Sequence, residues 1–175
     1  MGAARKGPAP TSMSPAEVER FLDEQRTLVL VTLRPDGSPV AHALWFVRLG
    51  DALYVNTRRD SLKARNLERD ARVCVLVEDG ESYFELRGVR VEGTCRPVSD
   101  RQEQEQVEAA QGAKAERIGS GMGELPAWFS RSRSRRLDRG ERILLKIPME
   151  RVYSWDFGKV REHYTRAADK QEARP

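Results

Sequence analysis

The chain has 175 residues, 39% of them hydrophobic and 33% charged, which is typical of one globular domain with an unusually charged surface. The net charge of +4 is too small to indicate a nucleic-acid binder by itself, although it favours anionic ligands. No apolar stretch reaches the ~20 residues that span a bilayer and no secretion signal is recognisable, so we expect a cytoplasmic protein without a membrane partner.

The first predicted element is an amphipathic helix over residues 15–24. Ser14 suits its N-cap, Pro15 suits the first helical position, and Glu17 completes a capping box with Ser14. The next run, TLVLVTL at residues 27–33, is too continuously apolar for a strand with one wet face. We therefore predict a strand that is buried on both faces. The turn RPDGSP that follows predicts a hairpin.

Further apolar runs, separated by turns, predict the remaining strands at residues 40–49, 51–57, 71–79, 82–98 and 142–157. The apolar phase of the fourth of these runs slips at Arg87-Gly88, which predicts a β-bulge. Two helices are inserted, a basic one near residues 61–70 and a polar one over residues 100–118. Six turn-linked strands with inserted helices favour a mainly β (α+β) fold that closes into a barrel over an alternating parallel sheet.

One domain is expected over residues 14–160. A disordered tail is predicted before it, at residues 1–13, and a loose polar tail after it, at residues 161–175. The two cysteines, Cys74 and Cys95, lie in strand-like runs and match neither a zinc nor a disulfide spacing. They are therefore predicted to be buried, inert thiols, and we predict no metal site.

A candidate site lies at the start of the basic helix, in the segment NTRRDSLKARN (residues 56–66). Asp60 or Ser61 can cap this helix, and free backbone N–H groups at a helix start favour negative charge. A serine hydroxyl, a lysine and one or two arginines at the same place would suit a phosphate. The alternative is a solvated, cationic helix, and the residues alone leave both interpretations open.

Four segments carry a resemblance that covers residues 15–157. They are VLVTLRPDGSPVAHALWF, LYVNTRRDSLKARNLERDARV, VEGTCRPV and RILLKIPMERVYSWDF, and the second matches best through its Ser-x-Lys and Asn-Leu pairs. Together they resemble the split β-barrel, flavin-binding family of pyridoxamine 5'-phosphate oxidase-like proteins, and within it the branch that uses the deazaflavin F420. The resemblance implies a six-stranded split antiparallel β-barrel of the FMN-binding type with peripheral helices.

The resemblance also implies where a cofactor would bind. Its phosphate would bind at Arg59, Ser61 and Lys63, with Asn66 alongside. Its ring would lie along the second predicted strand, residues 40–49, and the end of the third, residues 51–57. The implied ring contacts are Thr32, Pro39, Ala43, Leu44, Trp45, Asn56 and Thr57.

Proteins of this family are typically homodimers with the flavin between the subunits, so Trp128 or Trp155 could close the site from the second subunit. F420 is favoured over FMN because KARNL is similar to the deazaflavin branch. F420 also bears an oligoglutamate tail, for which the candidate partners are Arg58, Arg65, Arg69, Arg72 and the arginines of residues 131–142.

The implied function is an oxidoreductase that uses F420 or FMN for hydride transfer to a small conjugated organic substrate. No Ser-His-Asp set or paired carboxylates are placed for catalysis, so we assign no catalytic residue. His42 is interpreted as a structural or surface residue. One alternative is a non-catalytic flavin or haem carrier on the same barrel. Nucleic-acid binding through the arginine-rich segment is disfavoured, because that segment has few interleaved aromatic residues.

Overall fold

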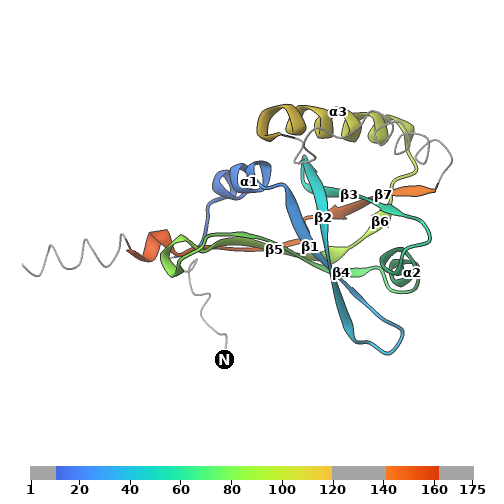
Figure 1. Cartoon of the computed structure of the whole chain (residues 1–175), viewed down its shortest axis with the longest axis horizontal. Helices are drawn as coiled ribbons and strands as arrows, with labels where there is room; N and C mark the ends of the chain where they lie inside the picture. The colour runs from blue at the N-terminus through green and yellow to red at the C-terminus, as the bar shows by residue number, and fades with distance from the viewer. Residues whose placement is uncertain (1–10, 120–140, 162–175) are drawn as a thin grey trace, which may run out of the picture.

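The computed structural model describes residues 11–119 and 141–161 of the chain (Figure 1). Its fold is mainly β, with one antiparallel sheet in the strand order β6-β7-β3-β2-β1-β4-β5-β8. The elements in chain order are α1 (Pro15–Glu24), β1 (Thr27–Leu33), β2 (Pro39–Leu49), β3 (Ala52–Arg58), α2 (Leu62–Arg69), β4 (Arg72–Asp79), the 3₁₀ helix η1 (Tyr83–Glu85), β5 (Arg87–Thr94), β6 (Arg96–Pro97), α3 (Arg101–Ile118), β7 (Arg142–Pro148) and β8 (Arg151–Asp156).

The described residues form eight strands where the sequence predicts six, because two of the predicted strands are each broken into two. The run 82–98 becomes η1, β5 and β6, and the run 142–157 becomes β7 and β8. The predicted bulge at Arg87-Gly88 is wrong, since the pairing of β4 with β5 continues through both residues without a break. The apolar phase changes there because Phe84 lies in the 3₁₀ turn and not in a strand.

The sheet curls so that its two ends approach each other. Strands β6 and β7 lie at one end of the strand order, and β5 and β8 lie at the other. Nevertheless β5 continues into β6 through Cys95 alone, and β7 continues into β8 through Met149 and Glu150. The backbones are close at this point, since a Cβ atom added to Gly93 would lie 2.9 Å from the carbonyl oxygen of Pro148. The described strands therefore form a curled half-barrel, which fits the predicted barrel.

Strand β2 belongs to both halves of this sheet. Its first part, from Pro39 to Trp45, pairs with β1, and its last part, from Phe46 to Leu49, pairs with β3. Beyond the pair of Phe46 with Val55, the described part of β3 pairs with β7 only. Strands β2 and β3 therefore separate after this pair, and their separation is the split in the barrel.

Two buried clusters fill the fold. The larger one packs α1 against the inner face of the sheet, and α1 contributes Val18, Phe21 and Leu22 to it. The smaller one lies beneath α3, which runs along β2 and the strands beside it (Figure 1). Among the residues of α3, only Val107 and Lys114 are buried. This helix is therefore held mainly by polar contacts, as its polar sequence requires.

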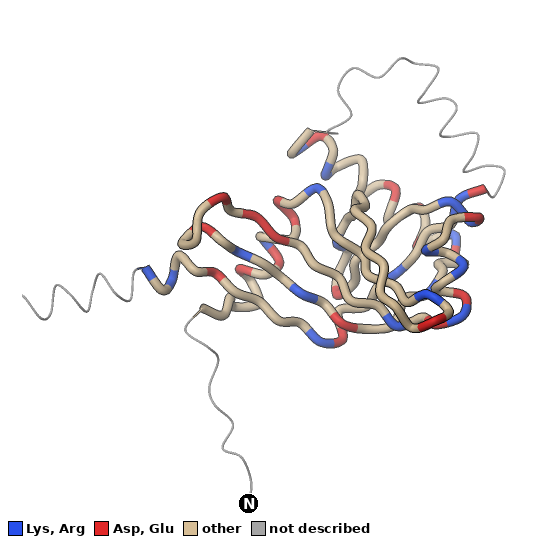
Figure 2. Tube along the Cα trace, turned by 60° about the horizontal axis from the view of Figure 1, so that its bottom comes forward, with Lys and Arg blue, Asp and Glu red and all other residues tan. Residues whose placement is uncertain are grey.

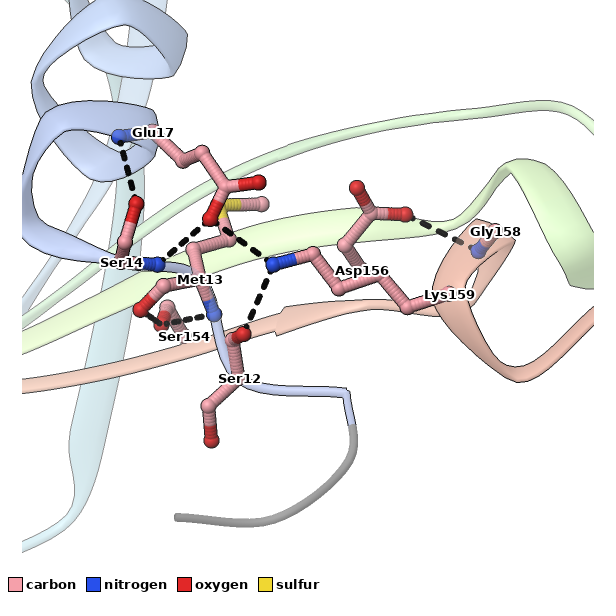
Figure 3. Close-up of polar contacts among 8 residues, drawn as sticks. All are labelled: Ser12, Met13, Ser14, Glu17, Ser154, Asp156, Gly158 and Lys159. Atoms are coloured by element: carbon pink, nitrogen blue, oxygen red, sulfur yellow. Dashed lines mark hydrogen bonds and ion pairs between the residues drawn. The ribbon is translucent and has the colours of Figure 1, made fainter. Parts of the chain in front are cut away.

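The residues before α1 cover the free edge of β8 (Figure 3). The backbone N of Asp156 donates a hydrogen bond to the carbonyl oxygen of Thr11 at 2.7 Å, and the backbone N of Met13 donates to Ser154 Oγ at 3.1 Å. The sequence assigns Thr11 and Met13 to a loose tail, but in the structure both contact the sheet. The rest of that predicted tail, residues 1–10, and nearly all of the C-terminal one lie outside the described residues.

Lys159 bonds to the segment before α1 and to α1 itself (Figure 3). Its Nζ donates to the carbonyl oxygen of Ser12 at 2.9 Å and to Glu17 Oε2 at 2.8 Å. Glu17 also accepts from the backbone N of Ser14 at 2.6 Å, which confirms the predicted capping box of α1. The hydrogen bonds from Lys159 and Ser14 lower the pKa of Glu17 to about 2.

The described ranges contain no helix that is long and apolar enough to cross a membrane. They also contain no group of three or more His, Cys, Asp or Glu side chains that could hold a metal ion. Cys95 is buried as predicted, and burial raises the pKa of its thiol to about 12. Cys74 is only half-buried, and burial raises its pKa as well. Both side chains are therefore thiols at neutral pH.

Candidate functional site

The predicted phosphate site lies where β3 ends and α2 begins. Ser61 is the N-cap of α2, and its Oγ accepts a hydrogen bond from the backbone N of Ala64 at 3.3 Å. Thr57 Oγ1, near the end of β3, lies 3.2 Å from Ser61 Oγ. The backbone N–H groups of Leu62 and Lys63 are in the first turn, where the helix offers them no acceptor. Two hydroxyl groups and the positive end of a helix therefore meet at one place.

A buried polar pair fixes α2 against β1. Asn66 Nδ2 donates to Thr32 Oγ1 at 3.1 Å, and both residues are almost fully buried, with exposed fractions of 1% and 0%. Arg69 donates to the carbonyl oxygen of Leu33 at the end of β1. In the described structure the Asn66–Thr32 pair thus lies between α2 and β1, where it can hold the helix in position. Their predicted contact with a ligand stays a prediction.

Lys63 lies in an environment that lacks negative charge. Burial, together with the nearby charge of Arg142 on β7, lowers the pKa of the Lys63 ammonium group. Arg142 Nη2 donates to the carbonyl oxygen of Asn56 at 3.3 Å, which places this guanidinium group beside the end of β3. In residues 11–119 and 141–161, no carboxylate pairs with Lys63. A partly buried ammonium group beside a second cation is suited to bind an anion.

His42 belongs to the same group of side chains. Its partner on β1 is Leu30, which is fully buried, so the imidazole ring lies on the core-facing side of β2. His42 Nδ1 is buried, and the described residues offer it no hydrogen-bond partner. Burial and the charges of Lys63 and Arg34 lower the pKa of His42. We did not predict His42 or Arg34 as site residues, although a histidine on the apolar phase of a strand was a visible signal.

The arginines near α2 are less available for an acidic cofactor tail than the sequence suggests. Arg58 pairs with Asp60 at 2.5 Å, and Arg72 pairs with Asp70 at 2.7 Å. Figure 2 shows acidic residues interspersed with the basic ones at this end of the molecule. Only Arg65, of the predicted set within the described residues, makes no side-chain hydrogen bond or ion pair. The predicted tail contacts stay a prediction, and most of residues 131–142 lie outside the described ranges.

Four of the predicted ring contacts lie where β2 and β3 separate. Leu44 and Trp45 of β2 directly precede the residues that pair with β3, and Asn56 and Thr57 are the corresponding residues of β3. Leu44 packs on the core, whereas Trp45 is 45% exposed. Ala43 is exposed beside them, and Pro39 is exposed at the other end of β2, where it pairs with Leu33. The structure thus brings four of the predicted ring contacts to the separation of the two strands, and their contact with a ring stays a prediction.

Trp155 does not lie with the other predicted ring contacts in this chain. It lies on β8, at the opposite end of the strand order from β3, and covers Gly88 of β5. A Cβ atom added to Gly88 would lie 2.2 Å from Cζ2 of Trp155, so the indole ring packs directly on the glycine. Trp128, the other predicted tryptophan, lies outside the described residues. That Trp155 closes the site from a second subunit stays a prediction.

A curled antiparallel barrel that is split between two strands is the architecture of the pyridoxamine 5'-phosphate oxidase-like split-barrel proteins. The chain matches the family model described as pyridoxamine 5'-phosphate oxidase over residues 14–156, and it belongs to this family. This match confirms the resemblance seen in the sequence motifs.

Solved structures of the same fold include proteins with different roles. A conserved hypothetical protein of Mycobacterium tuberculosis is 32% identical, with a TM-score of 0.70 over 89% of this chain and 92% of that chain. An F420 reductase is 23% identical, with a TM-score of 0.54 over 77% and 94%. The haem storage protein of Vibrio cholerae is 20% identical, with a TM-score of 0.56 over 82% and 96%. The last two show the fold alone. Among curated proteins, none matches the chain.

Proposed function

We propose that this protein is an oxidoreductase that binds F420, or alternatively FMN, and uses it for hydride transfer to a small conjugated organic substrate. The observation that supports the proposal is the Lys63 ammonium group at the start of α2, which no carboxylate of the described residues pairs with, near the place where β2 and β3 separate. A phosphate group would supply the negative charge that Lys63 lacks. The choice of F420 over FMN rests on the KARNL motif, and it agrees with the F420 reductase among the structures of this fold.

In this proposal the elements around the opening have separate tasks. Arg59, Ser61 and Lys63 bind the phosphate, while Asn66 and Thr32 hold α2 in place against β1. The ring lies against the residues at the split, namely Pro39, Ala43, Leu44, Trp45, Asn56 and Thr57. When bound, the cofactor supplies the hydride chemistry. The residues of this chain bind and orient it and exclude water from one of its faces.

A spectroscopic titration with F420 and FMN, side by side, tests the proposal. Lys63→Ala is expected to weaken binding more than tenfold, equivalent to more than about 1.4 kcal/mol, because it removes the ammonium group at the site. Arg101→Ala is a matched control, since it removes one positive charge from a side chain on α3 that is 91% exposed. Unchanged affinity in the Lys63 variant would refute the phosphate site, and no binding of either cofactor would refute the function.

We also propose that the protein is a homodimer. The outer face of the sheet carries Trp45 and Tyr153, which are 45% and 44% exposed, and the guanidinium group of Arg90 stacks 4.3 Å from the Tyr153 ring. Aromatic and arginine side chains are enriched at protein interfaces. Tyr153→Glu should therefore shift the mass measured by analytical ultracentrifugation from dimer to monomer. Tyr83→Glu, at another exposed aromatic residue, should not, and a wild-type monomer would contradict the proposal.

A non-catalytic carrier is the alternative function. It is supported by the absence of an assigned acid or base within the described residues, and by the haem storage protein that shares this fold. Reduced cofactor on the purified protein should be reoxidised by at least one enone or quinone if the enzyme proposal is correct. Persistence of the reduced cofactor against a broad panel of such acceptors would favour the carrier.

A further inference from the structure

His42 is half-buried, and its imidazole ring carries one buried nitrogen atom for which the described residues offer no partner. It lies on β2 opposite Leu30, on the side of the strand that faces the core. The described residues offer no hydrogen-bond partner to its Nδ1. Buried polar atoms almost always have a partner in a folded protein, so an unpaired one beside a candidate site indicates a missing ligand or proton.

The charged groups that face this imidazole ring are all basic. Lys63 approaches from α2, and Arg34 approaches from the turn between β1 and β2. Arg142, on β7, acts in turn on Lys63. No carboxylate from these elements offsets their charge at His42 within the described residues. A second proton on the imidazole is therefore unfavourable while the site holds no anion.

An anion at this place reverses that balance. Its negative charge would offset Lys63 and Arg34, and its oxygen atoms would accept a hydrogen bond from a protonated imidazole ring. We propose that His42 takes up a proton from solvent when the phosphate of the cofactor binds, and that the resulting imidazolium helps to hold this phosphate. This inference rests on the proposed function, because it assumes that the ligand at α2 carries a phosphate.

The consequence is binding that depends on pH in a defined direction. If the pKa of His42 is one unit higher in the complex than in the free protein, affinity is about tenfold stronger below both pKa values than above them. His42→Gln keeps a hydrogen-bonding side chain but cannot take up the proton. Its affinity should match that of wild type at pH 8.5 and should become weaker than that of wild type as pH falls, by about tenfold once pH lies below both pKa values. At each pH, the ratio of the dissociation constant of the variant to that of wild type cancels any titration of the ligand itself.

The protonation state can be measured directly, because the chain contains only two histidines. In an NMR titration of wild-type protein, the spectrum of His42→Gln identifies the His42 resonance and leaves that of His163 as a reference. The probe is whichever of F420 or FMN binds in the side-by-side titration, with the same ring lacking its phosphate as the control. We expect the phosphate-bearing ligand, and not the control, to raise the pKa of His42 by one unit or more.

Each outcome of this experiment separates the inference from the proposed function. A ligand that binds tightly without moving the His42 titration would overturn the inference and leave the function standing. An equal shift with the phosphate-free ring would also overturn it, since the proton would then follow the ring. If neither F420 nor FMN binds, the function fails and the inference fails with it. The pKa itself is measured on the wild-type chain, and His42→Gln serves only to assign the resonance.

Discussion

Lys114→Met is expected to stabilise the protein at neutral pH, although it removes a charged side chain that makes specific contacts. Lys114 lies on α3 and is only 8% exposed. Its Nζ donates to the carbonyl oxygen of Leu22 at 3.1 Å and lies 3.9 Å from the centre of the Phe46 ring. Burial nevertheless lowers the pKa of this ammonium group from 10.5 to about 8. The fold therefore disfavours the charge that Lys114 carries at pH 7.

The size of the effect follows from this shift. A lowering of about 2.5 units corresponds to a penalty of about 3 kcal/mol on the charged form. Methionine has a similar length and keeps the apolar contacts, but it leaves the carbonyl group of Leu22 without its donor, at a cost of about 1–2 kcal/mol. The expected net gain of Lys114→Met is about 1–2 kcal/mol at pH 7.

The pH dependence has a definite sign. Because the pKa of Lys114 is lowered on folding, the native protein binds fewer protons than the unfolded chain between about pH 8 and pH 10.5. Stability of the wild type should therefore rise with pH in this region, by about 1 kcal/mol between pH 7 and pH 9. Lys114→Met should lack this gain. Lys114→Arg cannot lose its proton in this range, so its disadvantage against wild type should grow with pH.

Urea denaturation of the three proteins at pH 7, 8 and 9 measures these differences. The difference between wild type and Lys114→Met cancels the titration of cysteines and tyrosines, which both proteins share. If this difference does not change with pH, or if the methionine variant is more than about 2 kcal/mol less stable than wild type, the reasoning from burial is wrong.

Three further predictions concern stability. Glu17→Gln should cost about 1 kcal/mol of stability at pH 7, because Lys159 holds the pKa of the Glu17 carboxyl group low. This stability is present above about pH 4.5 and is lost as pH falls toward 2, so a difference from wild type that persists at pH 2 in denaturation curves would contradict the prediction. Asn66→Ala should cost about 1–3 kcal/mol in urea denaturation by leaving a buried hydroxyl without its donor, and a cost near zero would count against the positioning role. Gly88→Ala should lower Tm by several degrees, since the added Cβ atom would lie 2.2 Å from the Trp155 ring. A second substitution, Trp155→Leu, should restore the Tm of the Gly88→Ala variant. An unchanged Tm in Gly88→Ala alone would show that the ring moves freely.

Local signals in the sequence were sufficient for some elements and not for others. The capping box at Ser14 and Glu17 depends on contacts within one turn and was predicted from residue types. The cap of α2 was narrowed to Asp60 or Ser61 in the same way, and the structure has Ser61. The break at Cys95 carries no turn residue, whereas Pro148, directly before the Met149-Glu150 link, is a residue suited to a strand end. The division of the two strands is imposed by the curling of the sheet, which only the complete barrel determines.

The candidate site divides in the same way. Ser61 and Lys63 belong to one short segment, so their proximity was visible in the sequence. Arg142 is far away along the chain, and the register of β7 on β3 brings it to the end of β3. Asn66 was predicted beside the phosphate from its motif, but the structure bonds its amide to Thr32 in the core. Spacing along a helix indicates a shared face, and it does not indicate which side chains the neighbouring strand will engage.

The segment from Thr11 to Met13 has a consequence for how the protein behaves in concentrated solution. A strand at the margin of a sheet can recruit strands from other molecules, and such recruitment leads to aggregation. This sheet is protected at both margins, by Thr11 to Met13 along β8 and by the shortness of β6, where Pro97 has no N–H to offer a neighbour. A shortened chain that begins at Pro15 would uncover the β8 margin while keeping every residue of the proposed site. Loss of solubility in that chain would then say nothing about its ability to bind a cofactor.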